Sequence, residues 1–163
     1  MEWGTLGVAA VGAFFGIGAT LVTDVVRSRR ERHQRWADAK RVAYARFLTA
    51  LAQAHSRMAL AAASGVSGLA RQQAVHDAFH SDPQHSDAKS VLRELALAAP
   101  DHVYRAAKPV YEQLRTARDM LATDGVSFDL PEYQQVIRPF FEDMEALQRL
   151  MRDDLQPPTS RRA

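Results

Sequence analysis

Two histidines, His76 and His80, are the residues whose type and spacing come closest to a chemical site. They lie four residues apart, so on a helix they share one face and could bind one metal ion. Asp82, His85 and Asp87 follow directly, and a third ligand would have to come from the loop that holds them. The alternative interpretation is a solvated polar linker interrupted by a proline. The sequence therefore offers a metal-binding enzyme or sensor as one candidate function.

Residue patterns for other kinds of catalysis are absent from the sequence. The chain has no cysteine, which excludes disulfides, thiolate zinc sites and thiol nucleophiles. It contains no GxxxxGK[ST] phosphate loop, no GxGxxG motif after a strand and no GxSxG elbow. Its carboxylates are spread over helix surfaces, without the Glu-x-x-His pairs of di-iron bundles. We therefore predict a protein that is not an enzyme and that uses no cofactor.

The elements that position these side chains are expected to be helices. Apolar residues recur at spacings of three and four, and no alternating strand pattern appears. A length of 163 residues corresponds to about one domain. Several amphipathic helices in such a chain can bury one shared core, so we predict an all-α, antiparallel helical bundle. The expected helices are one that ends near Ala63, a short one over 69–79, one capped by Ser86 or Asp87, one over 101–122 and one from Pro131.

Prolines and apolar faces refine this prediction. Pro100 predicts a break, Pro109 a bend, and Pro139 either a kink or a later start of the last helix. The positions expected in the core are Trp36, Tyr44, Phe47, Leu48, Leu51, Met58, Ala62, Val91, Leu92, Leu95, Val103, Ala107, Val110, Leu114, Ala117, Leu121, Tyr133, Val136, Phe140, Met144, Leu147 and Met151.

The N-terminal segment has a different composition from the rest of the chain. No charged residue occurs from Trp3 to Thr23. A helix over these residues would be about 31 Å long, close to the roughly 30 Å of a bilayer core. We therefore predict a transmembrane helix that continues into the bundle. The alternatives are a soluble oligomer that buries these helices against each other, and a signal peptide, which Glu2 disfavours.

Basic residues follow the predicted span directly. Residues 24–48 contain eight basic and three acidic side chains, and the first five basic ones form a juxtamembrane cluster: Arg27, Arg29, Arg30, Arg32 and Arg35. The positive-inside rule then predicts a single-pass protein of the bacterial inner membrane, with the N-terminus outside and the C-terminal domain in the cytoplasm. Few aromatic residues accompany the arginines, so we expect the lipid bilayer rather than nucleic acid as their partner.

The predicted span also carries small residues at helical spacing. Gly12 and Gly16 form a GxxxG motif, which Thr20 extends, and Ala9 and Ala13 flank it. Small residues at this spacing let two helix backbones approach closely. These five residues are the predicted transmembrane packing face, against another membrane protein or a second copy of the chain.

Four segments carry a resemblance to known sequences. They are the arginine cluster after Asp24, the Tyr44–Leu51 segment with Phe47 and Leu48, the Leu95–Pro100 element, and Arg152–Leu155 at the end of the last helix. On these segments the chain resembles a diffuse group of small, single-pass, membrane-anchored helical proteins of high-GC bacteria. That group has no established activity, so the resemblance implies an architecture and no site residues.

The sequence thus predicts an interaction protein without catalytic activity. We expect a membrane-tethered adaptor, scaffold or accessory subunit, with an anchor over 1–26, a cytoplasmic bundle over 27–155 and a disordered tail over 156–163.

Overall fold

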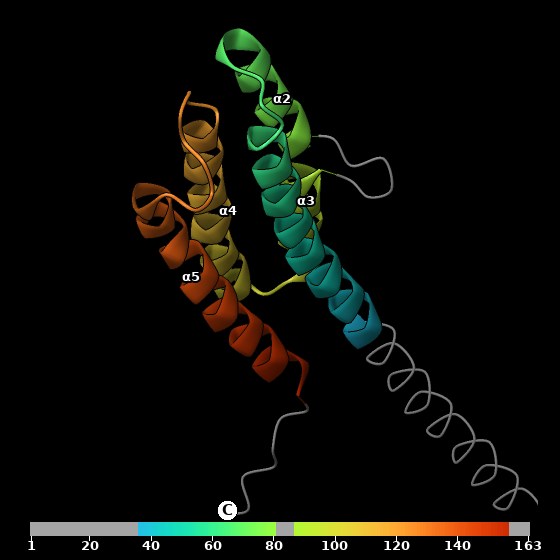
Figure 1. Ribbon diagram of the computed structural model, residues 1–163. Coiled ribbons are helices and arrows are strands. Elements are labelled where there is room, and N and C mark those ends of the chain that lie inside the picture. Colours follow the sequence, from blue (N-terminus) through green and yellow to red (C-terminus); the bar gives the residue numbers. More distant parts are fainter. Residues whose placement is uncertain (1–35, 81–86, 157–163) are drawn as a thin grey trace, which may run out of the picture. The chain divides into compact units, whose positions relative to one another are not determined.

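All regular secondary structure in the described part of the protein is helical. The computed structural model describes residues 36–80 and 87–156. Within them, residues 36–62 form a helix, followed by α2 (Gly68–His80), α3 (Ala88–Ala98), α4 (Asp101–Leu121) and α5 (Pro131–Leu155), and no strand occurs (Figure 1). The prediction of an all-α fold is confirmed.

The helices pack as an antiparallel bundle in which α2 and α3 together replace one long helix. Arg57 Nε donates to Ala78 O and Arg71 Nη1 donates to Ala62 O, so α2 runs antiparallel to the 36–62 helix. α4 packs against α2, α3 and α5. Tyr44 contacts Asp154, whereas His55 contacts Phe141, so α5 also runs antiparallel to the 36–62 helix.

Local sequence explains where the helices begin and end. Asp87 caps α3, because its side chain accepts a hydrogen bond from Ser90 N at 2.7 Å. Pro131 occupies the first turn of α5, where a missing N–H costs nothing. Gly125, just after α4, has a φ of 79°, a backbone conformation that favours glycine. Helix α5 begins at Pro131 and continues through Pro139, so the later start considered for this helix does not occur.

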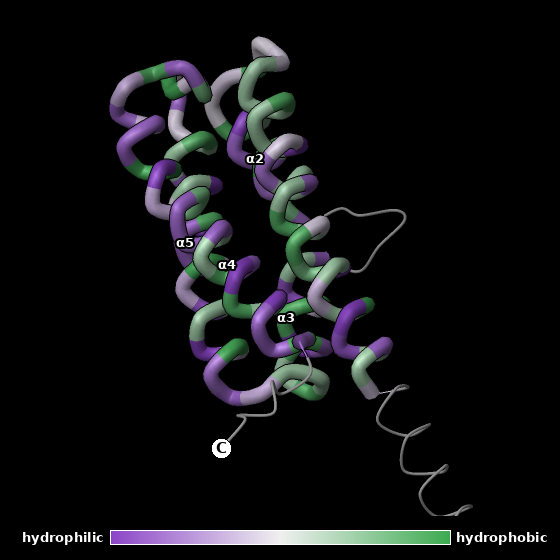
Figure 2. Tube along the Cα trace, turned by 90° about the horizontal axis from the view of Figure 1, so that it is seen from below, coloured by the Kyte–Doolittle hydropathy of each residue, from purple (hydrophilic) through white to green (hydrophobic). Residues whose placement is uncertain are grey.

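Each helix buries one face. Hydrophilic and hydrophobic residues alternate along every described helix (Figure 2), as expected for amphipathic helices around a shared core. The largest fully buried side chains are Tyr133, Phe47, Phe79, Phe140, Leu51, Met58, Leu95, Leu114, Leu121, Ile137, Leu147 and Val75.

Four positions of the predicted core are not buried. Leu48 and Met144 are half-buried and pack against the core, whereas Trp36 and Val136 lie outside it. Trp36 is 55% exposed. Val136 is only half-buried, and its neighbour Ile137 is buried instead. The reason is geometric: Tyr133, Ile137 and Phe140 follow a spacing of four and three, which continues without a break to Met151, whereas Val136 lies off this stripe.

The bundle belongs to the unit that begins at residue 39. The predicted packing face, Ala9, Gly12, Ala13, Gly16 and Thr20, lies outside the described residues, as does the predicted basic cluster from Arg27 to Arg35. The predicted boundaries of anchor, bundle and tail stay predictions.

The predicted localisation needs correction. In residues 36–80 and 87–156, every helix is too short or too polar to cross a membrane. This finding contradicts a single-pass inner-membrane protein with an outer N-terminus and a cytoplasmic C-terminal domain. The physical reason is that hydrophilic residues recur along the described helices, so none of them is a continuous apolar segment (Figure 2). The segment from Trp3 to Thr23, on which the prediction rested, lies outside the described residues.

Candidate functional site

The two histidines of the metal hypothesis lie on exposed positions of α2. The part of the chain that the structure describes contains no group of three or more His, Cys, Asp or Glu side chains that could hold a metal ion. The loop expected to supply a third ligand, residues 81–86, falls outside that part. His80 instead lines a cleft with Lys89 and Arg93, whose positive charges oppose binding of a metal cation.

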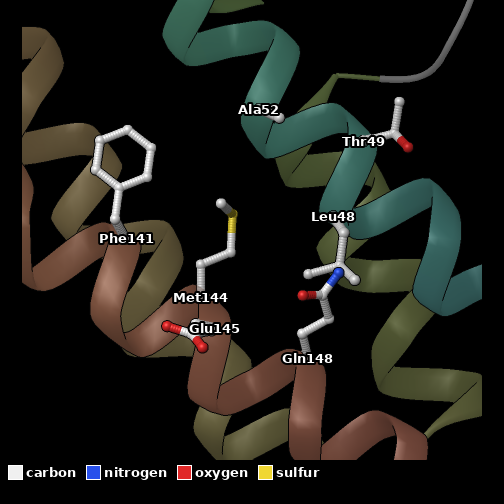
Figure 3. A pocket seen from close by; sticks show the side chains of 7 residues that line it. All are labelled: Leu48, Thr49, Ala52, Phe141, Met144, Glu145 and Gln148. Atoms are coloured by element: carbon white, nitrogen blue, oxygen red, sulfur yellow. The ribbon is translucent and has the colours of Figure 1, made fainter.

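An apolar groove lies between the 36–62 helix and α5. It has a volume of about 400 Å³. Its lining residues, hereafter the groove, are Leu48, Thr49, Ala52, Phe141, Met144, Glu145 and Gln148. Met144 extends from α5 into the space between the two helices, opposite Leu48 and Ala52 (Figure 3). Phe141 is 44% exposed, so the groove presents a large aromatic surface to solvent.

Behind Phe141 the same two helices meet through aromatic rings. His55 stacks on Tyr133 and Phe140 with ring centroids 6.4 and 6.1 Å apart, and meets Phe141 edge-on at 5.2 Å. We call these four residues the aromatic seam. Burial lowers the pKa of His55 and raises the pKa of Tyr133 to about 12. Neither His55 Nε2 nor the Tyr133 hydroxyl, both buried, has a hydrogen-bond partner among the described residues.

A second cleft, of a different chemical character, lies between α2, α3 and α4. Its volume is also about 400 Å³. Its lining residues, hereafter the cationic cleft, are His80, Lys89, Leu92, Arg93, Tyr104, Tyr111, Glu112, Arg115 and Arg118. Four of these side chains are permanently cationic at neutral pH and one is anionic.

The sequence prediction missed both concave sites. Leu48 and Met144 were expected in the core, but both are half-buried at the edge of the groove. One signal was present: Phe140 and Phe141 are adjacent, so a helix cannot bury both on one face. The second phenylalanine had to lie off the core stripe.

Comparison of the chain with protein-family models, with curated proteins and with solved structures found no match. The class that the fold defines is an all-α helical bundle, and its described part carries the groove and the cationic cleft. These two sites are the basis for a proposed function.

Proposed function

We propose that this chain is a protein-interaction module, an adaptor, scaffold or accessory subunit without catalytic activity, and that its groove binds one helix of a partner protein. The observation that carries this proposal is the exposed Phe141 beside the half-buried Met144, between two helices that leave about 400 Å³ between them. Methionine is flexible and polarizable, so it adapts to an incoming side chain. Exposed apolar surface within a concavity is typical of interaction sites.

The dimensions of the groove fit a helix. Its α5 wall extends from Phe141 to Gln148, which corresponds to about 10 Å at 1.5 Å per residue. This length matches two apolar side chains four residues apart on a partner helix, the usual anchors of helix-in-groove recognition. A folded, pre-formed groove also reduces the ordering cost of binding.

The charge of the groove limits which partner helices can bind there. Glu145 is the one charged residue that lines it, and Arg149 pairs with Glu145 at 2.9 Å on the exposed surface. Exposed pairs of this kind contribute little stability, so a lysine or arginine of the partner can replace Arg149 at small cost. We expect an amphipathic partner helix with a basic residue beside its apolar anchors. An apolar groove with a carboxylate does not suit nucleic acid.

The proposal is tested by site-specific crosslinking in cells. The photoreactive residue benzoylphenylalanine replaces Gln148 in the groove and, as a control, Arg105 on the exposed face of α4. We expect an adduct from position 148 only, with the crosslinked peptide mapping to an amphipathic helix that carries a basic residue. That peptide, synthesised, should bind the full chain and lose about tenfold in affinity to Met144→Lys, which places a charge in the apolar contact.

Three results would contradict the proposal. Equal adducts from positions 148 and 105 would show nonspecific contact. If the chain formed adducts only with itself, the groove would bind a second copy of the chain and not a helix of another protein. A peptide whose affinity is unchanged by Met144→Lys would place recognition elsewhere on the bundle.

A further inference from the structure

The cationic cleft brings four like charges together. Lys89 and Arg93 are exposed and lie one turn apart on α3, where two cations repel each other. Arg115 and Arg118 lie three residues apart on α4 and line the same cleft. Arg118 packs on the buried Phe79 ring, but no core contact accounts for Lys89 and Arg93 on the facing helix. Their convergence on the same cleft is a feature that a bound anion would explain.

Two ion pairs neutralise part of this charge, and the Asp87 carboxylate acts on His80 and Tyr111 at the edge of the cleft. Arg115 pairs with Glu112 at 2.7 Å, and Arg118 pairs with Asp119 at 2.6 Å. In residues 36–80 and 87–156, Lys89 and Arg93 have no carboxylate partner. The cleft therefore retains positive charge on its α3 side, beside His80 at the end of α2.

One of these cations is held in place by the fold. Arg118 is only 8% exposed, and its guanidinium lies 5.0 Å from the centre of the Phe79 ring. Asp119 accepts hydrogen bonds from Arg118 Nε and Nη2. A buried, oriented guanidinium loses less conformational entropy on binding an anion than a mobile surface arginine does.

Three further lining residues are largely apolar. Leu92, Tyr104 and Tyr111 contribute a hydrocarbon side chain and two rings to the same cleft. Tyr111 is buried, at 6% exposure, and Tyr104 is half-buried. A volume of about 400 Å³ exceeds the needs of an inorganic anion and lies in the range of small-molecule sites.

We propose that the cationic cleft binds an organic phosphate monoester, with the phosphate between Lys89 and Arg93 and a flat ring against Tyr104 and Leu92. Arginine and lysine together are the usual phosphate ligands of proteins, through charge-assisted hydrogen bonds. This site is separate from the groove, so its occupancy and partner binding are independent proposals.

The test is isothermal titration calorimetry of the full chain with AMP, adenosine and inorganic phosphate as probes. AMP should bind about tenfold more tightly than either of the others, because only AMP has both the phosphate and the ring. The double variant Lys89→Gln, Arg93→Gln should lose about tenfold or more in affinity for AMP. The matched control, Arg105→Gln with Lys108→Gln, removes the same charge from exposed positions of α4 outside the cleft and should leave the affinity within about twofold.

Each of the other outcomes would overturn one part of the phosphate monoester proposal. Equal affinity for AMP and adenosine, or an unchanged double variant, would overturn the phosphate site. Equal affinity for AMP and inorganic phosphate would overturn the organic ligand. If the chain cosedimented with phosphatidic acid vesicles but did not bind AMP, the cleft would recognise the phosphate of a lipid headgroup. That result would overturn the proposal of a soluble ligand.

Discussion

Two buried regions of the bundle treat their polar groups in opposite ways. At one end, Arg71 of α2 is 7% exposed, and all three of its guanidinium nitrogens donate to backbone carbonyls. Nε reaches Leu121 O at 2.9 Å, Nη1 reaches Ala62 O at 2.8 Å, and Nη2 reaches Val126 O. We call this arrangement the arginine clasp. In the aromatic seam, by contrast, His55 and Tyr133 each bury a polar atom without a described partner.

The clasp fixes one end of the bundle through hydrogen bonds, whereas the polar atoms of the aromatic seam hold no part of the bundle in this way. Ala62 and Leu121 are the last residues of their helices, where the carbonyls carry the negative end of the helix dipole. One buried arginine therefore neutralises two helix ends and holds the loop to α5, without any carboxylate. The seam lies beside the groove, where the partner is proposed to bind, and its polar atoms contribute nothing to holding the two helices together.

The largest effect is expected from the clasp. Arg71→Met keeps the apolar stem but leaves three carbonyls without their donor, so the free energy of unfolding should fall by about 3 kcal/mol or more. Urea denaturation followed by circular dichroism measures this change. Arg105→Met, at an exposed position with one hydrogen bond to Asp101 O, is the control and should cost about 0.5 kcal/mol or less. A loss below about 1 kcal/mol at Arg71 would mean that water replaces the guanidinium and that the clasp does not fix this end.

The clasp also marks the limit of what the sequence could predict. The helices themselves followed from spacing: the predicted segment 69–79 is α2, Gly68–His80, and Asp87 caps α3 as one of the two expected residues. Arg71 stands four residues before Val75 and eight before Phe79, so it occupies a core position of α2. That position could be recognised from the pattern, but its partners could not. These partners are backbone carbonyls at the ends of other segments. Every residue has a backbone carbonyl, so residue types do not show which carbonyls accept these hydrogen bonds.

The two concave sites were unpredictable for a related reason. Each is lined by residues from helices far apart in the sequence, such as Leu48 with Met144, or Lys89 with Arg115. Periodicity shows which face of a helix is buried, but not which helix lies opposite or how closely it packs. The histidine pair looked like a site because its residues are neighbours in sequence. The structure places His80 among cations instead.

A second cluster of hydrogen-bonded polar groups lies on the same two helices as the aromatic seam. It provides a direct comparison with the unpaired polar atoms of the seam. Asp154 of α5 accepts hydrogen bonds from Lys40 Nζ at 3.0 Å and from the Tyr44 hydroxyl at 2.6 Å. Asp154→Asn should lower the free energy of unfolding by about 1–2 kcal/mol at neutral pH, because the donors lose a charged acceptor. Chemical denaturation measures this loss.

The pH dependence of the same variant supplies an independent check. Burial opposes ionisation of Asp154, but the hydrogen bonds from Tyr44 and Lys40 outweigh it and hold its pKa below the usual value. The stabilisation is therefore present above the unfolded-state pKa of about 3.9 and is lost as the pH falls through the folded-state pKa. The difference between the wild-type chain and Asp154→Asn should shrink with acidification in this range. A constant difference would assign the loss to packing.

The seam should respond to acid at a higher pH than Asp154. Burial lowers the pKa of His55, so the unfolded chain binds a proton there more readily than the folded chain. The contribution of neutral His55 is fully present above the unfolded-state pKa of about 6.5 and is lost as the pH falls through the folded-state pKa. His55→Gln removes this dependence, whereas the other histidines are the same in both chains. Parallel stability profiles between about pH 8 and pH 5 would show that His55 is solvated and that the seam is open.

The smallest expected effect, that of removing the Tyr133 hydroxyl, tests whether the polar atoms of the seam are unpaired. Tyr133→Phe and Tyr44→Phe remove the same hydroxyl group from two buried tyrosines that lie between the same two helices, 1% and 3% exposed. The Tyr44 hydroxyl has Asp154 as its acceptor, so its loss should cost about 1–2 kcal/mol. The Tyr133 hydroxyl has no described acceptor, so its loss should change stability by about 0.5 kcal/mol or less, or raise it, because an unpaired polar group leaves the interior. Paired denaturation curves in one buffer measure both. Equal losses would mean that a bound water satisfies Tyr133, and the seam would then be as firmly hydrogen-bonded as the rest of the bundle.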